Sequence, residues 1–360
     1  MANELQKTQE QKLSPIQRAQ LFGQATRQHW QALPAISGGD GMVVSFDLPK
    51  VRLGSKVRLE VALKITASNT ATPTKCLFAP FTYIKNVRME SNLGFTFFNL
   101  SGRDLYFYNI LTQNYGYMDV DTPTAILSAS SRARNVQGAG GTSGDVNTCR
   151  FMVDLPITLN KRDAIGLVLL QNPESIITVT VEFGTIADLV ATTTNLTTSD
   201  VLLTPSVETF SIPAIQQAFP DISILKLVKS QTQAISATGV VNVKLPVGQT
   251  YRKLAWFIYD GNGAGVLDSS ISGNFELVLN QADIPYRIKP TMLAAINSEE
   301  YGKALPAGLY AFDFTDQGNA NYGGARDYID TERLTEFWLR FNGTASTNIT
   351  VIYESLVKLV

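Results

Sequence analysis

Residues 57–65 read Val-Arg-Leu-Glu-Val-Ala-Leu-Lys-Ile, with an apolar side chain at every second position and mainly charged side chains between them. A strict period of two predicts a β-strand with one buried and one solvated face. The same alternation recurs at residues 177–183, 275–279, 337–341 and 349–353. Strands with one polar face are typical of antiparallel sheets, so the sequence predicts an all-β protein built from sandwiches.

An internal repeat favours two such sandwiches. Residues 43–49 (Val-Val-Ser-Phe-Asp-Leu-Pro) resemble residues 240–246 (Val-Val-Asn-Val-Lys-Leu-Pro) near the start of each half. At the end of each half, residues 177–182 (Ile-Thr-Val-Thr-Val-Glu) resemble residues 349–354 (Ile-Thr-Val-Ile-Tyr-Glu). The first pair is separated by 197 positions (43 to 240) and the second by 172 (177 to 349), so we expect loops of different length in the two copies.

The boundaries between the halves come from composition. Residues 185–206 are rich in Thr, Ser, Asn and Asp, which is typical of a linker. The predicted units are a helical arm at 1–39, a first sandwich at 40–190, a linker at 191–206 and a second sandwich at 207–360.

Two insertions and one aromatic run complete the predicted organisation. The Gly- and Ser-rich residues 128–148 predict a surface loop, and residues 290–303 predict a short helix inserted in the second sandwich. A set of aromatic residues near strand connections suits either a subunit interface or the core. These residues are Tyr106, Phe107, Tyr108, Tyr115 and Tyr117.

The N-terminal arm follows a helical rather than a strand pattern. Ser14 and Pro15 predict a helix start, after which Ile16, Ala19 and Phe22 recur at every third position. The opposite face carries mainly glutamine, with four basic and two acidic side chains in the arm. Such a helix suits shallow contact with an anionic membrane surface or a groove between subunits; the alternative is a helix packed under the first sandwich. The candidate contact residues are Ile16, Arg18, Phe22, Arg27 and Trp30.

Composition limits the classes of partner. The chain has 360 residues, 44% of them hydrophobic, so it can bury a large core. Lys and Arg number 30 against 31 Asp and Glu, and a protein that coats nucleic acid directly needs a basic excess. We therefore expect no direct nucleic-acid contact. No apolar signal-peptide core follows Met1, so we expect synthesis in a cytoplasm, with Cys76 and Cys149 as free thiols.

The sequence offers little for catalysis or metal binding. His29 is the single histidine, so a Ser-His-Asp triad or a zinc site lacks its ligands. The glycine-rich residues 138–144 lack the Gly-Lys-Ser/Thr of a phosphate loop, and residues 260–268 lack the final acid of a calcium loop. A pair of carboxylates facing each other across a cleft is the one catalytic arrangement that the sequence allows. The alternative is that these acids are ordinary exposed residues of loops. These acids are Asp313, Asp316, Asp327 and Asp330. We predict no catalytic residue, no metal and no cofactor.

Residues 305–314, Leu-Pro-Ala-Gly-Leu-Tyr-Ala-Phe-Asp-Phe, follow the predicted inserted helix and precede the last strands. With the Gln-rich N-terminal helix and the two sandwich halves, they make nearly the whole chain resemble the double jelly-roll major capsid proteins of tailless, membrane-containing viruses, particularly tectivirus-like bacteriophages. The resemblance implies an all-β fold of two tandem β-jelly-roll sandwiches, with an N-terminal amphipathic helix and a short helix inserted in the second domain.

The resemblance also implies a function. Members form pseudo-hexagonal homotrimers that tile an icosahedral virion shell over an internal lipid membrane, with minor capsid or vertex proteins as further partners. The implied location is the virion capsid after synthesis in the host cytoplasm, and the role is structural rather than enzymatic. Two rivals stay open: a lectin-like binding protein and a carbohydrate-active enzyme on paired jelly rolls.

Overall fold

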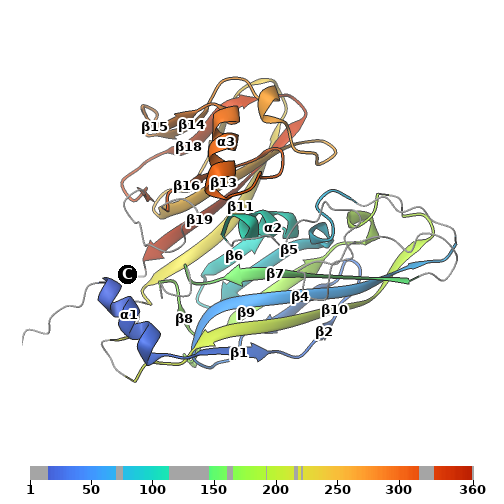
Figure 1. The fold of residues 1–360 in the computed structure, drawn as a ribbon, viewed down its shortest axis with the longest axis vertical. Helices are drawn as coiled ribbons and strands as arrows, with labels where there is room; N and C mark the ends of the chain where they lie inside the picture. Colours follow the sequence, from blue (N-terminus) through green and yellow to red (C-terminus); the bar gives the residue numbers. More distant parts are fainter. Residues whose placement is uncertain are drawn as a thin grey trace, which may run out of the picture.

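The computed structural model describes residues 15–69, 76–112, 146–159, 165–191, 193–214, 218–219, 222–315 and 328–358. The chain forms two β-sandwiches, one above the other in Figure 1, with a helix between them. Each sandwich is a jelly roll, so the predicted fold of two tandem jelly rolls is confirmed.

The first jelly roll packs a six-stranded sheet against a four-stranded layer. The six-stranded sheet has the order β1 (Gln28–Ala32), β10 (Leu196–Phe210), β4 (Leu53–Ala67) and β7 (Val146–Pro156), with β2 (Ile36–Ser37) beside β10 and β8 (Val168–Leu169) beside β4. The opposing layer has the order β6 (Thr96–Leu100), β5 (Ile84–Ser91), β9 (Ile177–Phe183) and β3 (Val43–Asp47). All pairs within this unit are antiparallel.

The second jelly roll repeats this arrangement. One layer has the order β16 (Leu309–Asp313), β13 (Thr250–Asp260), β19 (Thr347–Lys358) and β11 (Ile224–Ile235), with β17 (Ile329–Asp330) beside β13. The other is a four-stranded sheet of β12 (Gly239–Lys244), β18 (Phe337–Gly343), β14 (Phe275–Leu279) and β15 (Asp283–Ile288). Short 3-10 helices lie in several connections, among them η1 (Phe81–Tyr83), η2 (Ile186–Asp188) and η4 (Asp268–Ser270).

The strands of the two units correspond, except that the short β2 has no separate counterpart. In the first, the ladders align Gln28 with Phe210, Phe210 with Leu53, and Leu53 with Leu169. In the second, they align Lys226 with Leu356, Leu356 with Thr250, and Thr250 with Asp330. These two four-strand rows make β1 the counterpart of β11, β10 of β19, β4 of β13 and β8 of β17. Because β3 and β12 also correspond, the predicted repeat at 43–49 and 240–246 is confirmed.

The second predicted repeat is wrong. Residues 177–182 form β9, which pairs with β3 and β5, whereas residues 349–354 lie in β19, which pairs with β11 and β13. The counterpart of β9 is β18, and that of β19 is β10. Two neighbouring strands of a jelly roll share the same alternation, so residue identity alone matched the penultimate strand of one unit to the last strand of the other.

The linker predicted from composition at 191–206 is mostly strand. Residues 196–210 form β10, which lies between β1 and β4 in the six-stranded sheet. Val201, Leu203 and Val207 are buried, while exposed Thr197 and Ser199 and half-buried Thr204 and Ser206 give the segment its polar composition. The first jelly roll therefore extends beyond residue 190, through Phe210, and the second begins with β11 at Ile224 rather than at residue 207.

The predicted helical arm at 1–39 is only partly helical. Helix α1 (Pro15–Ala25) is followed by β1 and β2, which belong to the first jelly roll and place His29 and Trp30 on a strand. Thr26 ends the helix, since its hydroxyl and amide both donate to the Phe22 carbonyl, at 2.7 and 3.0 Å. Trp30 also falls outside the three-residue period of the apolar stripe, and an aromatic residue suits the edge of a sheet.

Two helices occupy corresponding places. Helix α2 (Gly102–Thr112) follows β6 and precedes β7; helix α3 (Pro290–Glu300), the predicted inserted helix, follows β15 and precedes β16. The eighth residue of each helix, Asn109 and Asn297, donates to and accepts from the backbone of the next strand, at Asp154 and Ala311, over 2.9 to 3.1 Å. A buried side chain thus satisfies both backbone groups at the edge of β7 and of β16.

Candidate functional site

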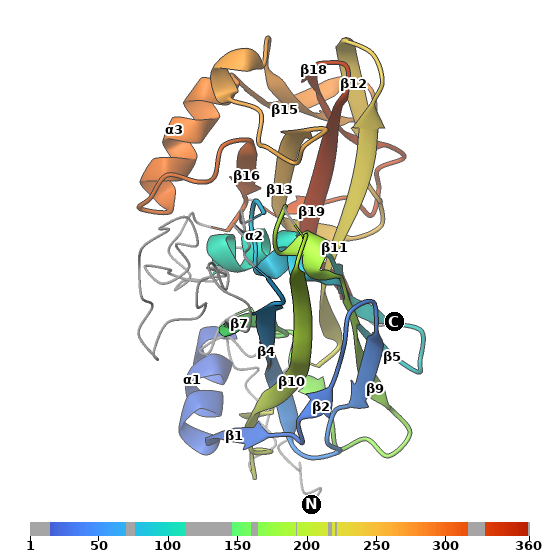
Figure 2. The same cartoon turned by 90° about the vertical axis from the view of Figure 1, so that its right-hand side faces the viewer.

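The junction between the jelly rolls is the first candidate site. Strands β6 and β11 run parallel and pair through Phe98 with Val228 and Asn99 with Lys229. This pairing merges layers of both units into one nine-stranded sheet. Helix α2 lies between the two units in both views, and β11 runs past it at the junction (Figures 1 and 2). The aromatic residues Tyr106, Phe107 and Tyr108 of this helix are buried, so the core alternative holds for them; Tyr115 and Tyr117 lie outside the described residues.

A buried polar network crosses this junction. Tyr108 of α2 donates to Glu354 of β19 at 2.5 Å, and Arg252 of β13 forms an ion pair with the same carboxylate. Lys226 of β11 donates to the Tyr108 hydroxyl at 3.2 Å and to the Thr158 carbonyl at 2.9 Å. These contacts join the two jelly rolls through charge-assisted hydrogen bonds that water does not reach.

The network shifts the pKa of its members. Burial raises the pKa of Glu354, but the nearby Arg252 and Lys226 outweigh burial and hold it at about 2. Burial lowers the pKa of Lys226 to about 7, although Glu354 opposes this change. Burial and the charge of Glu354 both raise the pKa of Tyr108. Glu354 is therefore the fixed anion of the junction, and Lys226 is its titrating cation.

The stability of the protein should depend on the protonation of Lys226. Between about pH 7 and its ordinary value of 10.5, the unfolded chain holds a proton that folded Lys226 releases. Linkage then makes stability rise with pH across this window, by at most about 1.4 kcal/mol per pH unit. Lys226→Met should remove that rise, as followed by urea unfolding at pH 7, 8 and 9. Lys244→Met, at an exposed position of β12, is the control, and equal pH slopes for wild type and Lys226→Met would contradict the assignment.

A second ion pair ties α2 to the second jelly roll. Lys253 of β13 contacts Asp313 of β16 at 2.8 Å and donates to the Leu111 carbonyl at the end of α2 over 3.1 Å. Tyr301 donates to Asp313 at 3.0 Å. The carboxylate singled out by sequence for catalysis therefore lies in a structural ion pair.

Of the other predicted carboxylates, Asp330 is the one in the described part of the chain. Asp330 caps the amide of Glu332 at 2.9 Å, and Asp260 caps the turn at Asn262 and Ala264. Asp316, Asp327, residues 138–144 and all but the last three residues of the predicted loop 128–148 lie outside the described residues. In the described part of the chain, no group of three His, Cys, Asp or Glu side chains is arranged to hold a metal. Neither Cys76 nor Cys149 forms a disulfide, as predicted.

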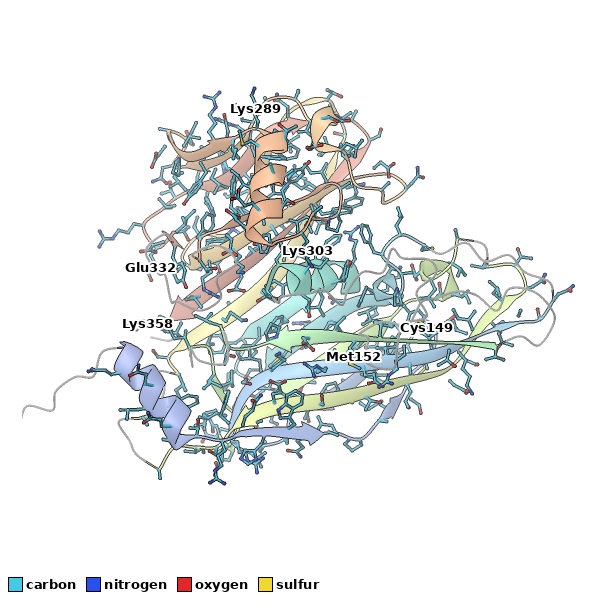
Figure 3. The ribbon with its side chains drawn as sticks, in the orientation of Figure 1. Cys149, Met152, Lys289, Lys303, Glu332 and Lys358 are labelled. Carbon is cyan, nitrogen blue, oxygen red and sulfur yellow. The ribbon has the colours of Figure 1, made fainter. Side chains whose placement is uncertain are left out.

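The N-terminal face is the second candidate site. Phe22 of α1 is 2% exposed and packs edge-on against Phe210, with ring centroids 5.4 Å apart. Leu53 and Leu167 complete this small cluster, so α1 is anchored to the first jelly roll. In the view of Figure 3, Lys358, the last residue of β19, lies on the same side as α1.

The five predicted contact residues do not form one surface. Phe22 faces the protein, as in the packing alternative, whereas Arg27 is exposed just after the helix. Trp30 is 59% exposed on β1, with the Arg58 guanidinium 5.3 Å from its ring centroid. The side chains of Ile16 and Arg18 lie outside the described residues. Among those described, no helix is both long enough and apolar enough to span a membrane.

The junction was missed in the sequence because its signal is weak. The strands that carry Lys226, Arg252 and Glu354 were expected to alternate apolar and polar residues. In such strands a charged residue ordinarily marks the solvated face. One pattern could have pointed to the helices beside it: Leu105 and Asn109 in α2 have the same spacing as Leu293 and Asn297 in α3. That Leu-x-x-x-Asn repeat is too short to find without the strands around it.

Comparison with known proteins identifies structures that share this fold. No family model matches the chain, and no curated protein does. The crystal structure of the STIV MCP, from Sulfolobus Turreted Icosahedral Virus, has a TM-score of 0.69 at 14% identity and covers 92% of this chain and 97% of that chain. The PBCV-1 virus capsid model gives 0.63 at 12% identity over 92% and 93%. The major capsid protein P2 of bacteriophage PM2 gives 0.54 at 13% identity over 93% and 98%. This chain has the double jelly-roll fold of viral major capsid proteins.

Proposed function

We propose that this chain is a major capsid protein that assembles with copies of itself into homotrimers and then into an icosahedral virion shell. The observation that carries the proposal is the shared double jelly-roll fold, which spans almost the full length of both this chain and the capsid proteins compared with it. A likeness confined to one jelly roll would be weaker support, because single jelly rolls serve many functions.

The described residues support a structural role rather than catalysis. Asp313 is buried in an ion pair with Lys253, and Glu354 in one with Arg252. Glu354 also accepts from Tyr108, and Lys253 donates to the Leu111 carbonyl, so both pairs are tied to α2 between the sandwiches, which suits a building block. The formal net charge of −1 further suits a shell that does not touch the genome directly.

We propose that the end of the molecule bearing α1 faces the interior of the particle, above an internal membrane. The support is the basic excess of the N-terminal arm and the exposed Arg27 after α1. Minor capsid or vertex proteins would complete the shell, and synthesis would take place in the host cytoplasm before the chain enters the virion.

The purified protein should be a homotrimer. Size-exclusion chromatography with light scattering should give about three times the chain mass of 39.3 kDa, because the two-unit fold tiles as a pseudo-hexagon only in threes. Electron microscopy should then show hexagonal tiles or shells. A species of 39.3 kDa that persists at high concentration would contradict the proposal.

Removal of the N-terminal arm should impair assembly more than folding. The deletion should end at residue 26, because removal of residues 1–35 would also take away edge strand β1. Truncated protein is expected to keep its trimer and its far-ultraviolet circular dichroism, but to yield fewer particles or particles that lose their membrane. Phe22→Ala is the matched control, since it loses the packing against Phe210 and keeps the arm. Complete membrane-filled particles at normal yield from the truncated protein would show that the arm only packs.

A further inference from the structure

We infer that neighbouring copies of this chain join through the outer edges of β15 and β1, in the manner in which β6 and β11 join the two jelly rolls within one chain. The inference rests on the proposed self-assembly and names the surfaces that carry it. Its partner is a second copy of this chain, bound head to tail.

The junction within the chain provides the template. Strand β6 ends one layer of the first jelly roll, and β11 ends one layer of the second, so their parallel pairing connects two sheet edges. Val228 and Phe98, which pair there, are both 0% exposed. Each jelly roll therefore has one edge that can give this contact and another that can receive it.

The free counterparts of these edges are β15 and β1. Strand β15 pairs with β14 as β6 pairs with β5: Tyr286 lies opposite Leu277, as Phe98 lies opposite Met89. Strand β1 corresponds to β11, because Gln28 and Lys226 begin equivalent rows across four strands. Two residues further along, Trp30 corresponds to Val228.

Exposure differs between these counterparts as an unfilled contact requires. Val228 is 0% exposed, but Trp30 is 59% exposed. Phe98 is buried, whereas Tyr286 is only half-buried, and the side chain of the next residue, Arg287, is 65% exposed. Among the described strands, β1 and β15 are the terminal members of their sheets. Large aromatic and arginine side chains are the residues that most often dominate the binding energy of a protein interface.

The template also fixes the register between the copies. Phe98 opposite Val228 becomes Tyr286 opposite the partner's Trp30, and Asn99 opposite Lys229 becomes Arg287 opposite the partner's Gln31. The contact joins two different edges, so it is heterologous and forms a ring where the rotation closes. Three chains, each with one internal and one external junction of the same kind, then close a ring of six jelly rolls.

The remaining open edges do not fit this template. Strands β7 and β16 end their layers beside α2 and α3, whose Asn109 and Asn297 bond to them. Strands β3 and β12 also end their layers, and they expose Val43 at 60% and Val240 at 67%. These two strands are counterparts of each other, and neither takes part in the junction within the chain. They therefore provide a control pair with similar exposure.

Cysteine cross-linking tests the inference in the full chain carrying Cys76→Ser. Gln31→Cys and Arg287→Cys are combined in one chain, since paired strands lie about 4.8 Å apart, within the span of a disulfide. Mild oxidation should give covalent dimers and trimers on a non-reducing gel, and reductant should remove them. Each single variant should give none, because residue 31 meets residue 287 and not its own copy. Val43→Cys with Val240→Cys should also give none.

Each result has one meaning. Trimers in light scattering without cross-links in the double variant would overturn the assigned edges and leave the proposed function standing. Cross-links in a single variant, or equal ones in the control pair, would overturn them too. A chain that stays monomeric at 39.3 kDa would overturn both the edges and the capsid proposal. As a second readout, Trp30→Ala should weaken the trimer at least about tenfold and Val240→Ala should not; equal effects would contradict the inference.

Discussion

Replacing Glu354 with glutamine is expected to lower the free energy of unfolding by about 3–5 kcal/mol, the largest effect we expect from a single polar substitution. The reason lies in the junction: Glu354 is the anion that faces both Arg252 and Lys226, and all three side chains are buried. Without it, Arg252 stays as a cation without its ion-pair partner in a site that water does not reach, and Lys226 loses the charge that opposes the fall of its pKa on burial. Urea unfolding of the purified protein at pH 7 measures the change.

The control for Glu354→Gln is an ion pair at the surface. Glu90→Gln breaks the exposed pair with Arg88 and should change stability by less than about 1 kcal/mol. A second variant tests the cause: adding Lys226→Met to Glu354→Gln should recover part of the loss, because it removes a buried amine that has lost its anion. Similar values for Glu354→Gln and Glu90→Gln would show that the network contributes little.

Asn109→Ala and Asn297→Ala are each expected to destabilise the protein by about 2–4 kcal/mol. Each change leaves one backbone amide and one backbone carbonyl of a strand without their partner inside the protein, at about 1–3 kcal/mol for each unsatisfied group. The exposed fractions of Asn109 and Asn297 are 0% and 1%, so water cannot replace the lost bonds. Thermal unfolding and hydrogen exchange at the amides of Asp154 and Ala311 measure the effect.

Isosteric and surface variants separate the hydrogen bonds from packing. Asn297→Asp keeps the shape and the acceptor but loses the donor to the Ala311 carbonyl, so it should also destabilise the protein. Asn262→Ala, in an exposed turn, should change stability by no more than about 0.5 kcal/mol. If Asn109→Ala or Asn297→Ala behaves like Asn262→Ala, the bonds to the strand edges do not stabilise the fold.

The alternation of apolar and polar residues predicted the strands that have one solvent-exposed face. The segment 57–65 is the centre of β4, and the strands at 177–183, 275–279 and 337–341 were equally readable. Strand β10 could not be recognised in this way, because Thr, Ser and Asp on its exposed side resemble a linker and its sequence contains Pro205. Helix α2 could not be recognised either: it is buried almost all round, so it has no apolar stripe with a helical period.

The candidate site was harder to predict from the sequence than the fold. A sequence shows that Lys226, Arg252 and Glu354 are charged, but only the packing of one sandwich on another decides that their faces are dry. Trp30 was selected for the wrong reason, as part of a helical stripe, and lies instead on an edge strand. Burial by distant segments is a tertiary property, and no local pattern contains it.

The continuous nine-stranded sheet has a mechanical consequence for the shell proposed above. Bending one jelly roll relative to the other would break the β6–β11 pairing and pull Tyr108 and Lys226 away from their partners across the boundary. Each chain should therefore behave as a stiff plate. Differences in curvature between a flat facet and a vertex would then be accommodated at the seams between molecules, so one rigid tile can serve shells of more than one radius.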